Sequence, residues 1–194
     1  MLAASVGGCG SSVSPGPTPS LPPSLPGLAC GIERWFVKTL ADDDASRVDP
    51  AVVTPISIQD LNGFASHCGS LPDRRTFPEE FRVFEVVGRI TYVAHEVDRD
   101  YHIAIEDPAA PGFSVVTELA DTLCQGAVRS PHLTTLMGAQ AMFSTLVGSR
   151  SPTALVGTTV RLKGVGFYDF DHGQRGRSRN CIELHPILAI EPNR

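Results

Sequence analysis

Apolar and polar residues alternate most regularly in the central part of the chain, and this alternation predicts a series of β-strands. The run VFEVVGRITYVAHEV places its apolar side chains from Phe84 to Tyr92 on one face of a long strand, and Gly88 allows a bend in its middle. After a polar turn, two shorter alternating segments follow over residues 101–106 and 113–119. Three consecutive strands of this kind predict a meander.

A helical pattern follows the meander. Ser130 is a suitable N-cap and Pro131 a suitable first residue for a helix of about 17 residues. Two more strands are predicted over residues 158–168 and 182–190. The order β-β-β-α-β-β, with a bent first strand and a helix between the third and fourth strands, is that of the OB fold. We therefore predict a mainly β chain that forms a five-stranded OB-like barrel.

The region before the barrel has a weaker pattern. Residues 31–39 are rich in aromatic and β-branched side chains and predict an additional N-terminal strand. Residues 45–80 carry four prolines and are expected to be mostly irregular, with one short helix over 58–64 that Ser57 would cap. One domain, residues 30–194, would contain all of these elements.

Charge divides the chain into two parts. The 21 acidic and 16 basic residues give a net charge of −5, and the first of them is Glu33. An acidic domain argues against a general nucleic-acid coat, so nucleic acid is not a favoured partner. The sequence has no apolar run long enough to span a membrane.

The uncharged head has the composition of an exported leader and spacer. Val6-Gly7-Gly8-Cys9 resembles the cleavage box of a bacterial lipoprotein, so residues 1–9 are expected to be the remnant of a signal peptide and Cys9 the lipidation site. Residues 10–29 are rich in proline and serine and predict an extended tether, or alternatively a ligand for a partner domain. We expect an extracytoplasmic protein of the bacterial envelope, lipid-anchored or secreted, that contacts membranes through the lipid alone.

Four cysteines remain for the folded part. In an oxidising compartment an even number predicts two disulfides, and the sequence leaves three connectivities open. The spacings contain no CxxC pair, which argues against a thiolate metal site. The disulfide candidates are Cys30, Cys68, Cys124 and Cys181.

The unusual polar residues lie in two predicted loops, 95–101 and 169–181. In an OB barrel, ligands bind at the loops that join strands 1 and 2 and strands 4 and 5, and on the strand face between them. The arginines nearby are candidates to hold phosphates or other anions. The ligand-binding candidates are Arg89, Asp98, Asp100, His102, Arg161, Lys163, His172, Gln174 and Arg175.

Histidines and carboxylates in this region offer metal-binding or acid–base chemistry. Glu183 and His185 are two residues apart on one strand and therefore share a face, and His172 lies in the loop before them. With His102, these three residues are the candidates for a divalent metal site, and His172, Glu183 and His185 are also the catalytic candidates. The alternative is that they are structural clamps that hydrogen-bond the loop backbone. No GxSxG or SxxK motif supports nucleophilic catalysis.

Several segments resemble those of a family of exported bacterial proteins with no established activity. They are CGIERWFVKTL, DRDYHIAIED, GVGFYDFDHGQRG with its HGQ sequence, and IELHPILAI with its ELHP sequence. The resemblance implies an envelope or secreted domain and assigns no catalytic residue. The chain departs from the family in Cys181 and in the RGRSR segment after HGQ.

These observations favour a ligand- or partner-binding module of unknown specificity that uses loops 95–101 and 169–181. Its ligand would be a small molecule, an anion or a protein. The alternatives are a metal-dependent phosphodiesterase or nuclease on the same barrel, and a structural envelope protein.

Overall fold

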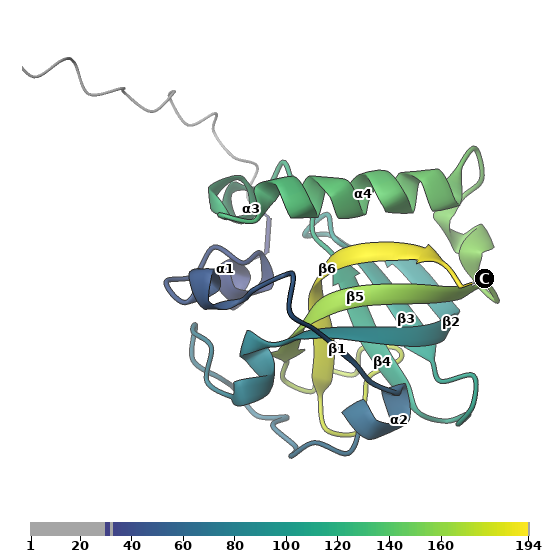
Figure 1. The fold of residues 1–194 in the computed structure, drawn as a ribbon, viewed down its shortest axis with the longest axis horizontal. Helices are drawn as coiled ribbons and strands as arrows, with labels where there is room; N and C mark the ends of the chain where they lie inside the picture. Colours follow the sequence, from purple (N-terminus) through teal and green to yellow (C-terminus); the bar gives the residue numbers. More distant parts are fainter. Residues whose placement is uncertain (1–29, 32, 194) are drawn as a thin grey trace, which may run out of the picture.

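The computed structural model describes residues 30, 31 and 33–193 and shows a closed β-barrel (Figure 1). Within this part, six strands form one sheet in the order β1-β2-β3-β4-β6-β5, and β2 also pairs with β5. The second pairing closes β2 to β6 into a five-stranded barrel with β1 outside it, so the predicted OB-like fold is confirmed. The strands are β1 (Val53–Pro55), β2 (Val83–His95), β3 (Tyr101–Glu106), β4 (Ser114–Leu119), β5 (Thr159–Tyr168) and β6 (Ile182–Pro192).

Strand β2 bends because it pairs with two different neighbours. Its first half, up to Arg89, lies antiparallel to β5, and its second half lies antiparallel to β3. The register shifts between Ile90 and Tyr92, after which Val93 enters the core. Tyr92 is therefore outside the core, and the prediction that it shares the face of Phe84 and Ile90 is wrong.

The longest helix, α4 (Leu133–Val147), lies along β6 and closes one side of the barrel (Figure 1). Its buried side chains Ala139, Phe143 and Val147 belong to the same core as the inner faces of the strands. The predicted helix is present, but it starts two residues after Pro131. A short helix α3 (Gln125–Arg129) precedes it and was not predicted. Three 3-10 turns lie at Ala45–Arg47, Pro78–Phe81 and Pro152–Leu155.

The region before the barrel differs most from the prediction. Residues 31–39 do not form a strand; they contain the helical turn α1 (Trp35–Lys38). Arg34 has a left-handed backbone with φ of 47°, which turns the chain into α1. The additional strand is β1, further along the chain and parallel to β2. The short helix was predicted correctly, because α2 (Ile58–Leu61) starts after Ser57, whose Oγ accepts the Asp60 N–H at 2.9 Å.

Residues 33–48, which we call the cover segment, pack on the outside of the barrel. Leu40, Ala45 and Val48 form a second core with Val83, Val165 and Leu188 and with residues of α3 and α4. These three strand residues point away from the main core. Strict alternation along the predicted strand 182–190 would place Leu188 on the side of Ile182 and Ile190. The register of β6 shifts near Pro186 and turns Leu188 outward instead.

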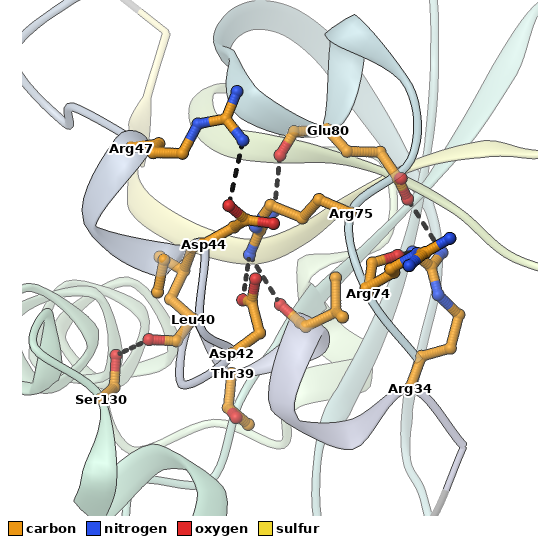
Figure 2. A network of polar contacts seen from close by, with 12 residues as sticks. Arg34, Thr39, Leu40, Asp42, Asp44, Arg47, Arg74, Arg75, Glu80 and Ser130 are labelled. Atoms are coloured by element: carbon orange, nitrogen blue, oxygen red, sulfur yellow. Dashed lines mark hydrogen bonds and ion pairs between the residues drawn. The ribbon is translucent and has the colours of Figure 1, made fainter. Parts of the chain in front are cut away.

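Buried ion pairs fix the cover segment to the barrel (Figure 2). Arg34 Nη1 lies 2.8 Å from Glu80 Oε1, and neither side chain is more than 3% exposed. Arg75 Nη2 lies 3.0 Å from Asp42 Oδ1 and also donates to the carbonyl of Val37 at 3.0 Å. The segment therefore has a defined position on the outer face of the barrel.

Two disulfides join all four predicted cysteines, Cys30 with Cys124 and Cys68 with Cys181. Such bonds are compatible with an extracytoplasmic location, where they persist. Among the described residues, no helix has the length and apolarity needed to cross a membrane. The predicted leader remnant, the lipidation site Cys9 and the tether 10–29 lie outside the described residues.

Candidate functional site

Four polar side chains gather on the outer face of β3, β4 and β6. His102 is paired in register with Glu118, and Val116 of β4 is paired with Glu183 of β6. Because strand residues alternate between faces, these side chains point away from the core formed by Ile103, Leu119 and Leu184. The four residues are His102, Glu118, Glu183 and His185.

The cover segment and loop 169–181 bury this polar face. Lys38 of α1 places its Nζ 3.5 Å from Asp169 Oδ2 and 5.4 Å from the centre of the Phe167 ring. In the loop, Gly176 lies directly against Ala104 of β3, where a side chain would collide. Glu183 and His185 are consequently at most 1% exposed.

Side chains on the polar face form a continuous series of contacts. His185 lies between two carboxylates, with Nε2 3.4 Å from Asp100 Oδ2 and Nδ1 3.1 Å from Glu118 Oε2. The other oxygen of Glu118, Oε1, lies 3.3 Å from His102 Nδ1. His102 Nε2 donates to the carbonyl of Arg175 at 2.8 Å, because a carbonyl can only accept. The series therefore runs from Asp100 to the backbone of loop 169–181.

Burial and neighbouring charges shift the protonation of the two glutamates in opposite directions. Burial opposes ionisation of Glu118, but His185, His102 and Lys38 outweigh it and lower its pKa to about 2. Burial, together with the charges of Glu118 and Asp169, raises the pKa of Glu183 to about 8. At neutral pH one carboxyl group is therefore ionised and the other is protonated.

The pKa values of His102 and Lys38 rise, which favours their charged forms, whereas that of Asp100 rises and opposes its charge. Burial alone would lower the pKa of His102, but contact with Glu118 and the Arg175 carbonyl raises it. Burial likewise opposes the charge on Lys38, and the surrounding carboxylates, Glu118 first, raise its pKa. Burial raises the pKa of Asp100, and His185 partly offsets this rise.

A pocket of about 330 Å³ opens above the polar face, and both predicted loops form its walls. A second hollow of about 350 Å³ adjoins it and shares Lys38, Asp98 and His172. The first pocket is lined by Lys38, Tyr92, Glu96, Val97, Asp98, His102, Glu118, Asp169, His172, Gly173, Gln174 and Arg175.

The structure brings most of the predicted site residues to this pocket. Five of the ligand-binding candidates line it: Asp98, His102, His172, Gln174 and Arg175. Asp100, Glu183 and His185 are buried near it, and Gln174 Nε2 donates to Glu183 Oε1 at 3.3 Å. The predicted metal and catalytic candidates thus lie in one region, although His172 is at its rim with a side chain that is 46% exposed.

Three predicted ligand-binding residues lie elsewhere. Arg89 pairs with Glu106 at 2.7 Å, and both Arg161 and Lys163 pair with Glu85. Their positions on β2 and β5 do not adjoin the pocket between the loops. The arginines of loop 169–181 also diverge: Arg177 pairs with Asp171, and Arg179 lies over the Phe113 ring. The structure therefore contains no common anion-binding cluster among these described residues.

Sequence reasoning missed Lys38 and Glu118. Glu118 is an acidic residue in a strand that is otherwise apolar apart from threonine and serine, and its register with His102 could have been expected from the meander. Lys38 carried no comparable signal, because its place depends on how the cover segment packs. No family model matches this chain, and no curated protein shows significant similarity to its sequence. The resemblance to a family of exported proteins therefore stays a prediction.

Proposed function

We propose that this protein is an extracytoplasmic binding module whose ligand occupies the pocket between loops 95–101 and 169–181. The observation that carries the proposal is the pocket itself, because residues of both loops line it and a buried polar face lies beneath it. OB barrels bind ligands at the equivalent loops and on the adjoining strand face.

The lining favours a small polar molecule. The volume of the pocket, about 330 Å³, is at the lower end of the range for small-molecule sites. Carboxylates (Glu96, Asp98 and Asp169) and cations (Lys38 and Arg175) lie around one opening, so a ligand with several hydrogen-bonding groups would find both donors and acceptors. A long polyanion is not favoured, because the other loop arginines are engaged with the protein itself.

The proposed location rests on two supports of different kinds. The disulfides are typical of proteins that fold outside the cytoplasm. The lipoprotein-like box at Cys9 and the proline-rich residues 10–29 support attachment to the bacterial envelope. In this proposal the tether presents the barrel away from the membrane surface.

A metal-dependent hydrolase is the second candidate function. Three buried side chains of ligand type, Asp100, Glu118 and His185, lie close together beside the pocket. A cation there would be next to any molecule that reached Glu118, which also lines the pocket. Cleavage of a bis-nitrophenyl phosphate ester after addition of Mn²⁺ or Zn²⁺ would favour this candidate over simple binding.

A thermal-shift screen with small polar molecules tests the binding function. A ligand at 100 times its Kd adds about 2.7 kcal/mol of stability, which raises the Tm of a chain of this size by roughly 5–10 °C. Arg175→Ala and Gln174→Ala should each reduce the shift. Arg129→Ala removes an exposed arginine from α3 and should leave it unchanged.

The opposite result would identify a structural protein. If no compound shifts the Tm, and the Arg175→Ala and Gln174→Ala variants differ from the wild type in stability alone, then the pocket has no binding role.

A further inference from the structure

Three potential metal ligands meet at the buried end of the polar face. Asp100 is the residue before β3, Glu118 lies on β4 and His185 on β6, and one ligand atom of each lies within 4.8 Å of the others. Asp100 is 1% exposed and His185 is 0% exposed. Glu118 and His185 are held by strands of the closed barrel, and Asp100 by its bond to the Asp121 N–H, so the three ligands have little freedom to separate.

Polar atoms directed into this space lack hydrogen bonds. Among the described residues, Asp100 Oδ2 and both ring nitrogens of His185 have no hydrogen-bond partner, although they lie near one another. The distances of 3.4 Å and 3.1 Å to the two carboxylates bring the charges close without the direction that a hydrogen bond requires. An unsatisfied buried polar group costs about 1–3 kcal/mol. A cation that binds Asp100 Oδ2 and one ring nitrogen of His185 would therefore satisfy two of these three atoms.

We propose that Asp100, Glu118 and His185 bind one divalent transition-metal ion, Zn²⁺ or Mn²⁺. Carboxylate and imidazole ligands suit both ions. In the tetrahedral geometry usual for Zn²⁺, two ligand atoms about 2.1 Å from the ion are roughly 3.4 Å apart. The three ligand atoms lie within 4.8 Å of one another, so they need to approach by at most about 1.5 Å.

The surrounding contacts match those of an outer shell of ligands. The second oxygen of Asp100, Oδ1, accepts the Asp121 N–H at 2.8 Å, and the second oxygen of Glu118 faces His102 Nδ1. Each carboxylate is thus oriented by one oxygen and leaves the other for the cation. Glu118 and His102 also line the pocket, which gives the ion a route from solvent.

The proposed site retains only one of the four metal ligands that the sequence predicts. Of the four candidates, His185 is a ligand, His102 supports Glu118 from outside, and Glu183 contacts Gln174 instead. His172 is at the rim, 3.7 Å from Asp169. The proposal goes beyond ligand binding, because the ion would bind whether or not a molecule occupies the pocket.

Metal titration of the full chain tests the proposal. Chelator-treated protein should bind one equivalent of Zn²⁺ or Mn²⁺ in isothermal titration calorimetry. Asp100→Asn and His185→Gln should each weaken binding at least 100-fold, and His102→Gln should weaken it 10–100-fold, as removal of an outer-shell partner does. The control variants Asp43→Asn and His132→Gln should bind as the wild type does.

Absence of stoichiometric binding of either ion would overturn the metal site, and so would binding that Asp100→Asn and His185→Gln leave unchanged. Because a variant can fail to fold, a second measurement uses the zinc-loaded wild type alone. Its X-ray absorption spectrum should show a single imidazole ligand, and two or more imidazole ligands would also overturn the metal site. If the wild type binds no metal but still shows a ligand-induced Tm shift, the metal site alone is refuted. If it binds the metal but no ligand shifts its Tm, the ligand-binding function alone is refuted.

Discussion

Charged residues of this protein differ greatly in what surrounds them, as Glu80 and Asp44 in Figure 2 show. Glu80 is fully buried, pairs with Arg34, and accepts the backbone N–H groups of Thr76 and Tyr168. Asp44 pairs with Arg47, whose side chain is 62% exposed. Water can replace the partner of Asp44 but not those of Glu80.

This contrast predicts unequal costs of substitution. Glu80→Ala leaves Arg34 charged and buried without its partner, and we expect a loss of about 3–5 kcal/mol in the free energy of unfolding. Asp44→Ala should cost less than about 1 kcal/mol. Urea denaturation of the two variants measures both values, and equal costs would show that the buried network contributes no more than a surface pair.

Single residues also show where sequence reasoning succeeds and fails. His102, His172 and Gln174 were predicted because the fold assigns ligands to the loops that carry them or adjoin them. Lys38 could not be found in this way, since no local pattern says that α1 brings this side chain beside Asp169 and Phe167. Arg161 was expected at the site but pairs with Glu85. Strand alternation predicts the face on which a side chain lies, but it does not predict which residue lies beside that side chain.

Among the elements, β2 shows how one glycine allows the barrel to close. Gly88 is the residue before β2 passes from β5 to β3. A Cβ at this position would lie 2.8 Å from Ile105 Cδ1 and 2.9 Å from Ile58 Cδ1. The absent side chain thus leaves room for Ile105 and Ile58 in the core, in addition to allowing the predicted bend.

We expect Gly88→Ala to lower the stability by about 1–3 kcal/mol, as overpacking of a core does. Gly138→Ala is the matched control, because a Cβ there, on α4, has no neighbour within 4 Å. It should stabilise the helix by up to about 1 kcal/mol. Thermal denaturation of the pair gives the comparison, and a stabilising Gly88→Ala would contradict this account of the core.

The strands and the long helix of the barrel were predictable because each has its own repeating pattern of apolar residues. The pattern fails where the strand register shifts, at the point that turns Tyr92 outward and at the point that turns Leu188 outward. The segment 31–39 failed for another reason. Its aromatic and β-branched residues favour a strand, but Trp35 is buried against Gly126 of α3 and Val37 is also buried, and this tertiary packing outweighs local preference.

At the scale of the whole molecule, the disulfides hold the two coverings of the polar face. Cys124 is the N-cap of α3, and its bridge ties Cys30, three residues before the cover segment, to the start of this helix. Cys181 ends loop 169–181 and ties it to Cys68, in the segment before β2. The first bridge therefore holds the segment that supplies Lys38 to the pocket, and the second holds the loop that forms one of its walls.

Removal of the first bridge should loosen the cover segment before the barrel. We expect the double variant Cys30→Ser/Cys124→Ser to lose roughly 2–5 kcal/mol, and amide exchange over residues 33–48 should accelerate more than exchange in β2 to β6. Cys68→Ser/Cys181→Ser should instead accelerate exchange in loop 169–181. Uniform acceleration along the chain in both variants would show that the coverings do not open separately from the barrel.

The connectivity of these bridges has a further consequence for a protein exposed to proteases. The two bridges interleave along the chain, since Cys68 lies between Cys30 and Cys124, and Cys124 lies between Cys68 and Cys181. A single backbone cut anywhere from residue 31 to residue 180 therefore leaves both fragments joined by at least one bridge, and a cut between residues 69 and 123 leaves them joined by two. Nicked protein would migrate as one species on a gel until it is reduced.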